Sequence, residues 1–217
     1  MELDAGDQGD AERMSVAVVD YGMGNRRSVE KALEHVGARR VRITGAAAEI
    51  ARAERIVIPG VGAFPRAMRN LRALGLEPVL RERAAAGVPV LGVCLGMQLL
   101  FDSSTEHEGA TGLGLLAGEV TALEADGHKL PHIGWNRVAL KPGARLTAGL
   151  GAAAAFYHVH SFVCRPVVAT DTVGESEYGE TFASIVERDN VAGVQFHPEK
   201  SSTDGLAMLR NWLGGDA

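Results

Sequence analysis

Apolar and polar positions alternate in blocks along the first half of the chain, and the blocks predict strands and helices in turn. Short apolar runs bounded by glycine or proline turns are typical of buried strands, and they occur at 15–20, 41–44, 55–60 and 88–93. Helical spacing of apolar residues predicts helices over 25–37, 63–73 and 76–86. Strands that alternate with helices at this spacing predict βαβ crossovers and a largely parallel sheet.

The pattern changes from about Gly112, where glycines become frequent and the apolar runs become short. These runs predict a more antiparallel half, and they are 118–123, 137–140, 153–162, 167–170, 183–186 and 191–196. An amphipathic helix is predicted over 203–213. With no repeat or linker in the sequence, we expect one α/β domain over 14–217, preceded by a disordered acidic tail over 1–13.

Composition narrows the class of protein. The 217 residues carry a formal net charge of -5, which argues against a nucleic-acid binder. Much of that charge is local, because residues 1–14 hold five acids against one arginine. That segment has no apolar stretch of the kind found in signal peptides, and no run of eighteen apolar residues predicts a membrane span. Two cysteines form no disulfide framework, so we expect a cytoplasmic protein.

Cys94 directly follows the predicted strand 88–93, within the sequence Gly92-Val-Cys-Leu-Gly96. The pattern small-x-nucleophile-x-small is that of a nucleophile elbow, in which flanking glycines let a strained strand-to-helix turn pack tightly. A helix predicted over 97–101 would direct its N-terminal N–H groups at the thiol and favour the reactive thiolate. The alternative is a buried structural cysteine, which is the commonest fate of a free cysteine.

A thiolate nucleophile needs a histidine to carry a proton to its leaving group. His197 is the best placed of seven histidines, because it follows the apolar run 191–196 and precedes Glu199 by two residues. Pro198 favours extended backbone between them, so imidazole and carboxylate would face the same side and the carboxylate could fix the tautomer. The alternative is a surface His-Pro-Glu turn.

Backbone N–H groups could stabilise the oxyanion of a thioester route. One candidate donor is the N–H of Leu95, and another comes from Gly60-Val61-Gly62, which follows the strand 55–60. The glycine spacing and the lack of a lysine make this segment a poor phosphate loop, and a plain structural turn remains an alternative.

The other histidines predict no metal centre. His35 falls in a predicted helix and His107 and His128 in polar loops, where solvent exposure is expected. His158 and His160 could face one side of a strand, but no cysteine or acid completes a ligand set. We therefore expect these two to be structural or to line a substrate pocket, and we expect no metal and no cofactor.

Several short motifs occur in a distinctive order. PGVG, GVCLGMQ and HPE follow one another along the chain, and the wider set is VDYGMGNRRSV (19–29), PGVGAF (59–64), LGVCLGMQLLF (91–101), GLGLL (112–116), PHIGWN (131–136), HVHSF (158–162) and QFHPEKS (195–201). On the first three motifs the chain resembles the class I (triad) glutamine amidotransferases. On the wider set, which covers nearly the whole chain, it is similar to the glutaminase subunits of imidazole glycerol phosphate synthase from histidine biosynthesis.

The resemblance implies a three-layer α/β, flavodoxin-like fold with a mixed, mostly parallel central sheet. It also implies glutamine hydrolysis, in which Cys94 attacks the side-chain amide and His197, supported by Glu199, protonates the departing ammonia. Val61 and Leu95 match the oxyanion hole, and the loop that holds Val61 would turn inward only when the partner site is occupied. Further matches to substrate-binding positions are Gly60, Gly62, Gln98, Glu106, Ser161 and Phe162.

The same resemblance implies a partner, a cyclase subunit with a (β/α)8 barrel that pairs with this chain as a heterodimer. Ammonia from L-glutamine would pass to that subunit, which forms imidazole glycerol phosphate and aminoimidazole carboxamide ribotide. Positions that match the partner face and the ammonia path are Pro131, Ile133, Trp135, Asn136 and Lys200. The chain departs from the family pattern at Arg26, at Ile133 and at Phe162, which usually read leucine, methionine and tyrosine.

Three other functions stay open on the sequence. An amidotransferase could serve a different acceptor, such as those of vitamin B6, anthranilate or purine synthesis, although PHIGWN and HPEKS argue against it. A non-catalytic scaffold would bind the partner only, although Cys94, His197 and Glu199 are all present. A free-standing cysteine peptidase or γ-glutamyl hydrolase would turn over its substrate without any partner.

Overall fold

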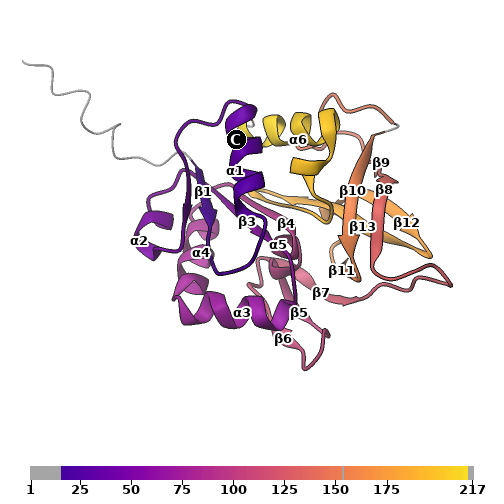
Figure 1. The fold of residues 1–217 in the computed structure, drawn as a ribbon, viewed down its shortest axis with the longest axis horizontal. Coiled ribbons are helices and arrows are strands. Elements are labelled where there is room, and N and C mark those ends of the chain that lie inside the picture. The colour runs from indigo at the N-terminus through magenta and orange to yellow at the C-terminus, as the bar shows by residue number, and fades with distance from the viewer. Residues whose placement is uncertain (1–15, 153, 215–217) are drawn as a thin grey trace, which may run out of the picture.

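A computed structural model of the chain describes residues 16–152 and 154–214. Five parallel strands form its centre in the order β2-β1-β3-β4-β14 (Figure 1), and they are β1 (Val16–Val19), β2 (Val41–Thr44), β3 (Arg55–Gly60), β4 (Val90–Cys94) and β14 (Val191–Val194). Their side chains alternate between the two faces of the sheet. In β3, for example, Ile56 and Ile58 enter one apolar cluster and Val57 enters the other.

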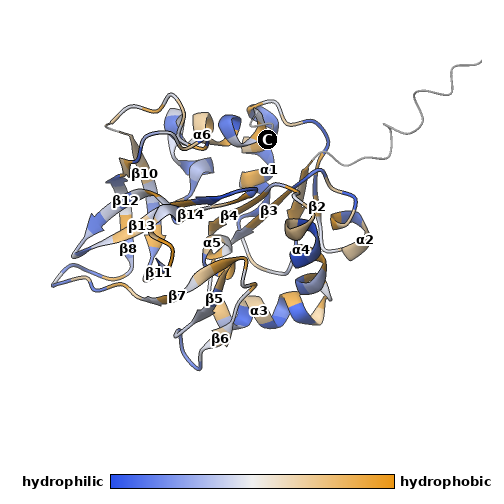
Figure 2. Ribbon diagram, turned by 180° about the vertical axis from the view of Figure 1, so that it is seen from behind, coloured by the Kyte–Doolittle hydropathy of each residue, from blue (hydrophilic) through white to orange (hydrophobic). Residues whose placement is uncertain are grey.

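Helices cover both faces of this sheet and make three layers (Figure 1). One face carries α1 (Arg26–His35) and α6 (Ser202–Gly214), whose Leu33 and Trp212 share a buried cluster with Val57. The opposite face carries α2 (Ala47–Ile50), α3 (Phe64–Ala73), α4 (Leu76–Ala85) and α5 (Leu95–Leu99). Figure 2 shows the central strands β3 and β4 as hydrophobic, whereas α3 alternates between the two colours, as expected of a helix with one solvated face.

The second half of the chain extends the sheet with pairings that are antiparallel, except for the parallel pair of β5 and β7. Beyond β14 the order is β13-β11-β7-β5-β6, with β12 pairing to β13 and β9 pairing to β12. These strands are β5 (Phe101–Ser104), β6 (Ala110–Thr111), β7 (Leu116–Ala122), β9 (Ala139–Leu140), β11 (Phe162–Pro166), β12 (Thr172–Tyr178) and β13 (Glu180–Arg188). A separate antiparallel pair consists of β8 (His132–Arg137) and β10 (Ala155–His160).

The structure confirms the α/β class and the mixed sheet, and it corrects several local predictions. The helix predicted over 97–101 is instead α5 at Leu95–Leu99, because Phe101 already pairs in register with Leu116 as the start of β5. The apolar run 167–170 is not a strand, and a short 3-10 helix, Ala169–Asp171, begins within it. The sequence predicted neither α2 nor the strands β5, β6, β8, β11 and β12, apart from one terminal residue each of β8 and β11.

β12 escaped prediction because its sequence, TVGESEY, carries no run of apolar residues. Its burial nevertheless alternates along the strand, and it pairs with β13 over most of its length. The predicted acidic tail, 1–13, lies outside the described residues. Within the described part of the chain, no helix is both long and apolar enough to cross a membrane.

Candidate active site

Cys94 sits at the junction of β4 and α5 in a strained backbone conformation, with φ 56° and ψ -111°. Positive φ is unusual for a residue other than glycine, and such strain concentrates at functional sites. Close contacts with neighbouring backbone atoms require glycine at both flanking positions, Gly92 and Gly96. A Cβ added at Gly92 would lie 2.6 Å from Gly96 O, and one added at Gly96 would lie 1.6 Å from the carbonyl oxygen of Ile58. The predicted elbow is therefore present, and it presents a buried thiol at the carboxyl end of a central strand.

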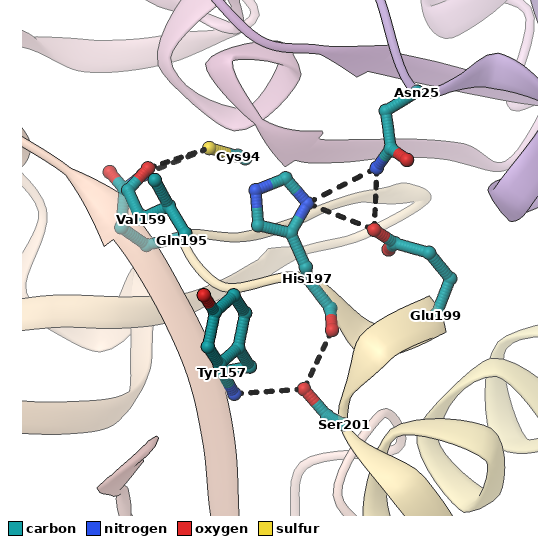
Figure 3. A network of polar contacts seen from close by, with 8 residues as sticks. All are labelled: Asn25, Cys94, Tyr157, Val159, Gln195, His197, Glu199 and Ser201. Carbon is teal, nitrogen blue, oxygen red and sulfur yellow. Dashed lines mark hydrogen bonds and ion pairs between the residues drawn. The ribbon is translucent and has the colours of Figure 1, made fainter. Parts of the chain in front are cut away.

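His197 and Glu199 meet beside this thiol (Figure 3). Nδ1 of His197 lies 2.9 Å from Oε1 of Glu199, and both side chains are almost completely buried. In Figure 3 the other ring nitrogen points toward Cys94. The structure thus brings the three residues together in the order thiol, imidazole and carboxylate. The extended backbone predicted across Pro198 is wrong, because Pro198–Lys200 is a short 3-10 helix, and Glu199 reaches the imidazole from that turn.

Electrostatics in this group favour an ion pair. Burial by itself lowers the pKa of His197, but hydrogen bonds and charge interactions with Cys94 and Glu199 outweigh it and raise that pKa to about 10. An imidazolium is therefore the stable form of His197 near neutral pH, and it can donate a proton to a leaving group.

Two polar residues hold the imidazole and its carboxylate in place. The side-chain amide of Asn25, which precedes α1, donates a hydrogen bond to Oε1 of Glu199 at 2.5 Å. Ser201 donates a hydrogen bond to the carbonyl of His197 at 2.6 Å and accepts one from the backbone N–H of Tyr157 at 3.0 Å (Figure 3). Sequence reasoning assigned neither residue a role, although both lie in motifs that it had singled out.

Gln195 is a further residue that the sequence analysis missed. It is fully buried one residue beyond β14, its Nε2 lies 3.9 Å from Sγ of Cys94, and its Oε1 accepts a hydrogen bond from Gln98 at 3.2 Å. A polar side chain in the apolar run 191–196 was the signal that could have identified it.

An open cavity of about 350 Å³ leads to the thiol. Most of its lining consists of residues predicted to bind substrate or the oxyanion, namely Val61, Gly62, Leu95, Gln98, Glu106, Ser161 and Phe162. Pro131, from the predicted partner face, lines it as well. Val159 and His160 complete it. The carboxylate of Glu106 is anchored, because it accepts the backbone N–H of Phe64 at 2.7 Å.

The segment Gly60-Val61-Gly62 packs against the loop that follows β1. Tyr21 donates a hydrogen bond from its hydroxyl to the carbonyl of Pro59 at 2.6 Å, and a Cβ at Gly60 would lie 2.3 Å from that hydroxyl. A Cβ at Gly62 would lie 2.7 Å from the Met23 side chain, and Gly62 has φ 117°. Only glycine fits these two positions without strain, which explains the pattern PGVG.

The remaining predicted partner residues form an exposed surface near the cavity. Ile133 and Trp135 on β8 are 59% and 56% exposed, which is high for large apolar side chains, and Lys200 is exposed as well. Asn136 is half-buried on the same strand. The unusual Arg26 forms an ion pair with Asp20 at the start of α1.

Three buried histidines lie behind this surface, at His132, His158 and His160. Burial lowers the pKa of His132 to about 4 and that of His158 to about 3, and it holds the pKa of His160 well below its usual value. All three are neutral imidazoles at physiological pH. Among the described residues, no cluster of histidine, cysteine and acidic side chains could hold a metal ion.

Comparison with known proteins places the chain in a class. Residues 17–214 match the family model of the class-I glutamine amidotransferases. Solved structures have the same fold at low sequence identity. One titled as the crystal structure of a glutamine amidotransferase has a TM-score of 0.71 at 20% identity, over 93% of this chain and 100% of that chain. PurLQS from Thermotoga maritima gives 0.73 at 18% identity, over 93% of this chain and 98% of the other.

Together with the strained cysteine at the end of β4, these matches define a class-I glutamine amidotransferase. Closer relatives are imidazole glycerol phosphate synthase subunits HisH. The subunit of Moorella thermoacetica is 49% identical over 198 residues, which cover 91% of this chain and 93% of that protein. The subunit of Aquifex aeolicus is 46% identical over 199 residues, which cover 92% and 96%. The chain therefore belongs to the HisH family of class-I glutamine amidotransferases.

Proposed function

We propose that this chain hydrolyses L-glutamine at Cys94 and delivers the ammonia to a cyclase partner. The thiolate attacks the side-chain amide carbon, and the N–H groups of Leu95 and of the Val61 loop receive the oxyanion. His197 gives its proton to the departing nitrogen, so ammonia leaves and a γ-glutamyl thioester forms on the sulfur. His197 then takes a proton from water as the water attacks the thioester, which releases glutamate and restores the enzyme.

The single observation that carries this mechanism is the coupling of His197 to both Cys94 and Glu199. The carboxylate lies 2.9 Å from Nδ1, and the pKa of His197 is raised to about 10 by these two neighbours against the effect of burial. A buried structural cysteine would not need a strained backbone, two tightly packed glycines and a charged imidazole beside it.

The cavity fits the side chain of an amino acid. Its volume, about 350 Å³, lies in the range of small-molecule sites, and its wall combines the carboxylate of Glu106 with the amide of Gln98. Gln98 is held by two acceptors, the Phe162 carbonyl at 3.1 Å and Gln195 at 3.2 Å. We propose that Gln98, Glu106, Ser161 and Phe162 orient the glutamine. The replacement of tyrosine by Phe162 preserves the aromatic wall.

The partner in this proposal is a cyclase subunit with a (β/α)8 barrel, paired with this chain as a cytoplasmic heterodimer. Support comes from the exposed apolar side chains of Ile133 and Trp135, and from Pro131, which lines the cavity and joins it to that surface. Lys200 is exposed three residues beyond His197, so it offers a further contact point beside the catalytic turn. Ammonia released at Cys94 would leave the cavity through this surface, and the partner would use it to form imidazole glycerol phosphate and aminoimidazole carboxamide ribotide.

The test measures glutamate release from glutamine by the chain alone, with the cyclase subunit, and with the cyclase subunit and its nucleotide ligand. We expect little activity alone and strong stimulation in the full mixture. Cys94→Ala should abolish glutamate release while the complex still forms product from added ammonium. Persistent glutaminase activity in that variant would overturn the mechanism, and turnover of γ-glutamyl peptides without a partner would indicate a free-standing hydrolase.

A further inference from the structure

A continuous hydrogen-bonded chain runs from β8 to the glutamine cavity. At the cavity end, the carbonyl of Phe162 lies 3.0 Å from Nδ1 of His160 and accepts the amide of Gln98 at 3.1 Å. Nε2 of His160 lies 3.1 Å from Nδ1 of His132. At the surface end, the amide nitrogen of Asn136 lies 3.4 Å from Nε2 of His132.

The carbonyl oxygens of Phe162 and Glu177, near the two ends of this chain of contacts, fix the direction of every hydrogen bond in it. A carbonyl can only accept, so Nδ1 of His160 carries the proton and Nε2 is an acceptor in the neutral ring. Nδ1 of His132 must then be the donor to it, which leaves Nε2 of His132 to accept from Asn136. Asn136 also donates to the carbonyl of Glu177 at 2.9 Å, so its amide nitrogen is fixed as a donor.

This arrangement allows only neutral rings. A proton on Nε2 of His160 would face the N–H of His132, and a proton on Nε2 of His132 would face the Asn136 amide. Burial disfavours both charged forms, in keeping with the low pKa values of the two histidines. His132 is further fixed by stacking on Tyr178, with ring centroids 4.0 Å apart and planes tilted by 21°.

We propose that His132 and His160 are positioning residues that tie the glutamine cavity to the surface strand β8. The inference rests on the proposed function, because that function makes the β8 surface a partner face and the cavity a glutamine site. His160 orients the Phe162 carbonyl, that carbonyl helps to orient Gln98, and a partner that moves Asn136 changes the hydrogen bond on which the chain depends. The two histidines act through Gln98 and Phe162 and take no part in the chemical steps.

His158 provides a matched control. It lies on β10 two residues before His160, is fully buried, and stacks against His132 at 4.9 Å between ring centroids. Its own ring contacts are different, since Nδ1 lies 3.1 Å from the Phe156 carbonyl and Nε2 lies 3.4 Å from Oγ of Ser184. The substitutions His132→Phe and His158→Phe therefore remove the same group from the same cluster, but only the first breaks the chain to Gln98.

The experiment measures glutaminase kinetics of both variants in complex with the cyclase subunit, together with their melting temperatures and their affinities for that subunit. We expect His132→Phe to raise the KM for glutamine about tenfold and to change kcat by less than about threefold. We expect His158→Phe to leave KM within about twofold of the wild type. His132→Asn, whose amide can take the place of the Nδ1 donor, should restore most of the loss. Equal KM values in the two phenylalanine variants, or no recovery with asparagine, would overturn the proposal.

A second measurement needs no activity. Nitrogen-15 spectra of the histidine side chains in the isolated chain should show His132 and His160 as neutral rings protonated at Nδ1. Asn136→Ala, which changes only a half-buried amide, should shift the Nε2 signal of His132. Protonation at Nε2 of either ring would overturn the proposal even if the variants failed to fold. A wild-type complex without glutaminase activity would instead contradict the proposed function. The nitrogen-15 spectrum would then still test the hydrogen-bonded chain through His132 and His160.

Discussion

The side-chain amide of Asn25 donates a hydrogen bond of 2.5 Å to Oε1 of Glu199, across 174 residues of sequence. The same carboxylate oxygen lies 2.9 Å from Nδ1 of His197. The loop after β1 therefore takes part in fixing the carboxylate that orients the imidazole. This contact also ties the beginning of α1 to the turn that follows β14, two segments that meet only because β1 and β14 belong to one sheet.

Removal of the Asn25 amide is expected to lower kcat while glutamine binding is retained. Asn25 has φ 77°, so Asn25→Gly preserves the backbone conformation and deletes only the side chain. Loss of a hydrogen bond to a charged group corresponds to about 1.5–3 kcal/mol, and we expect kcat of the partner-stimulated glutaminase to fall by about tenfold or more. Asn25→Asp tests whether this position needs a hydrogen-bond donor. It places a second carboxylate beside Glu199, which should lower kcat further than Asn25→Gly does. Unchanged kcat in both variants would contradict a positioning role.

Gly96→Ala is expected to destabilise the fold. The added methyl group would lie 1.6 Å from the carbonyl oxygen of Ile58, which belongs to a central strand and cannot move aside. We expect a loss of about 3 kcal/mol or more in the free energy of unfolding, measured by denaturant titration. Gly151→Ala is the control, because nothing lies within 4 Å of a Cβ at that position and its backbone is not in the positive-φ region. Equal stability of the two variants would show that the elbow is not tightly packed.

Local sequence patterns predicted the parallel half of the fold well and the antiparallel half less well. β3 and β4 are buried on both faces and so form continuous apolar runs, whereas β12 alternates glutamates with buried positions and has no such run. The pairing partner of β12 lies in β13, and a contact between strands is not visible in the residues of one strand alone.

The candidate site shows the same division. Cys94 ends β4, His197 and Glu199 follow β14 within five residues, and the carboxyl ends of parallel strands meet at one edge, so their meeting could be predicted. The role of Tyr21 could not, because it depends on a single long-range contact, and the polar side chain of Gln195 within an apolar run marked the position without identifying its partners. Tyr21 reaches the carbonyl of Pro59, 38 residues away, and Gln195 reaches Gln98 and Cys94.

Tyr21→Phe is expected to slow glutamine hydrolysis without changing the reactivity of the thiol. The Tyr21 hydroxyl is buried, and burial together with the charge on Cys94 raises its pKa well above the usual range, so it remains a donor. Its loss leaves the Pro59 carbonyl without this partner next to the proposed oxyanion loop, and we expect kcat to fall about tenfold. Alkylation of Cys94 by iodoacetamide forms no oxyanion and should keep its rate.

Tyr178→Phe is the matched control for Tyr21→Phe. It too loses a hydroxyl that donates to a backbone carbonyl, that of Lys129 at 2.8 Å, but this contact is exposed, and phenylalanine keeps the ring that stacks on His132. We expect its kcat and alkylation rate to match the wild type. A parallel fall of both rates in Tyr21→Phe would indicate general damage to the fold and would contradict the specific role.

The pH dependence of activity should reveal the ion pair of His197. Its pKa is raised in the folded protein, to about 10 from a usual value of about 6.5. The stabilisation from this extra proton is therefore fully present below about pH 6.5 and is lost as pH rises through about 10. Because the imidazolium donates its proton to the departing amide nitrogen, kcat/KM for glutamine should decline on the alkaline side as that proton is lost.

Glu199→Gln removes one of the two charges that hold the proton on His197. The midpoint of the alkaline decline in kcat/KM should therefore move to lower pH, by about one to three units, while the remaining activity at neutral pH falls. Glu34→Gln, an exposed change on α1, should leave the profile in place. The profile is measured as glutamate release by the complex at constant ionic strength. An unmoved midpoint in Glu199→Gln would mean that the carboxylate orients the ring without setting its charge, because glutamine keeps one acceptor oxygen for Nδ1 of His197 but carries no charge.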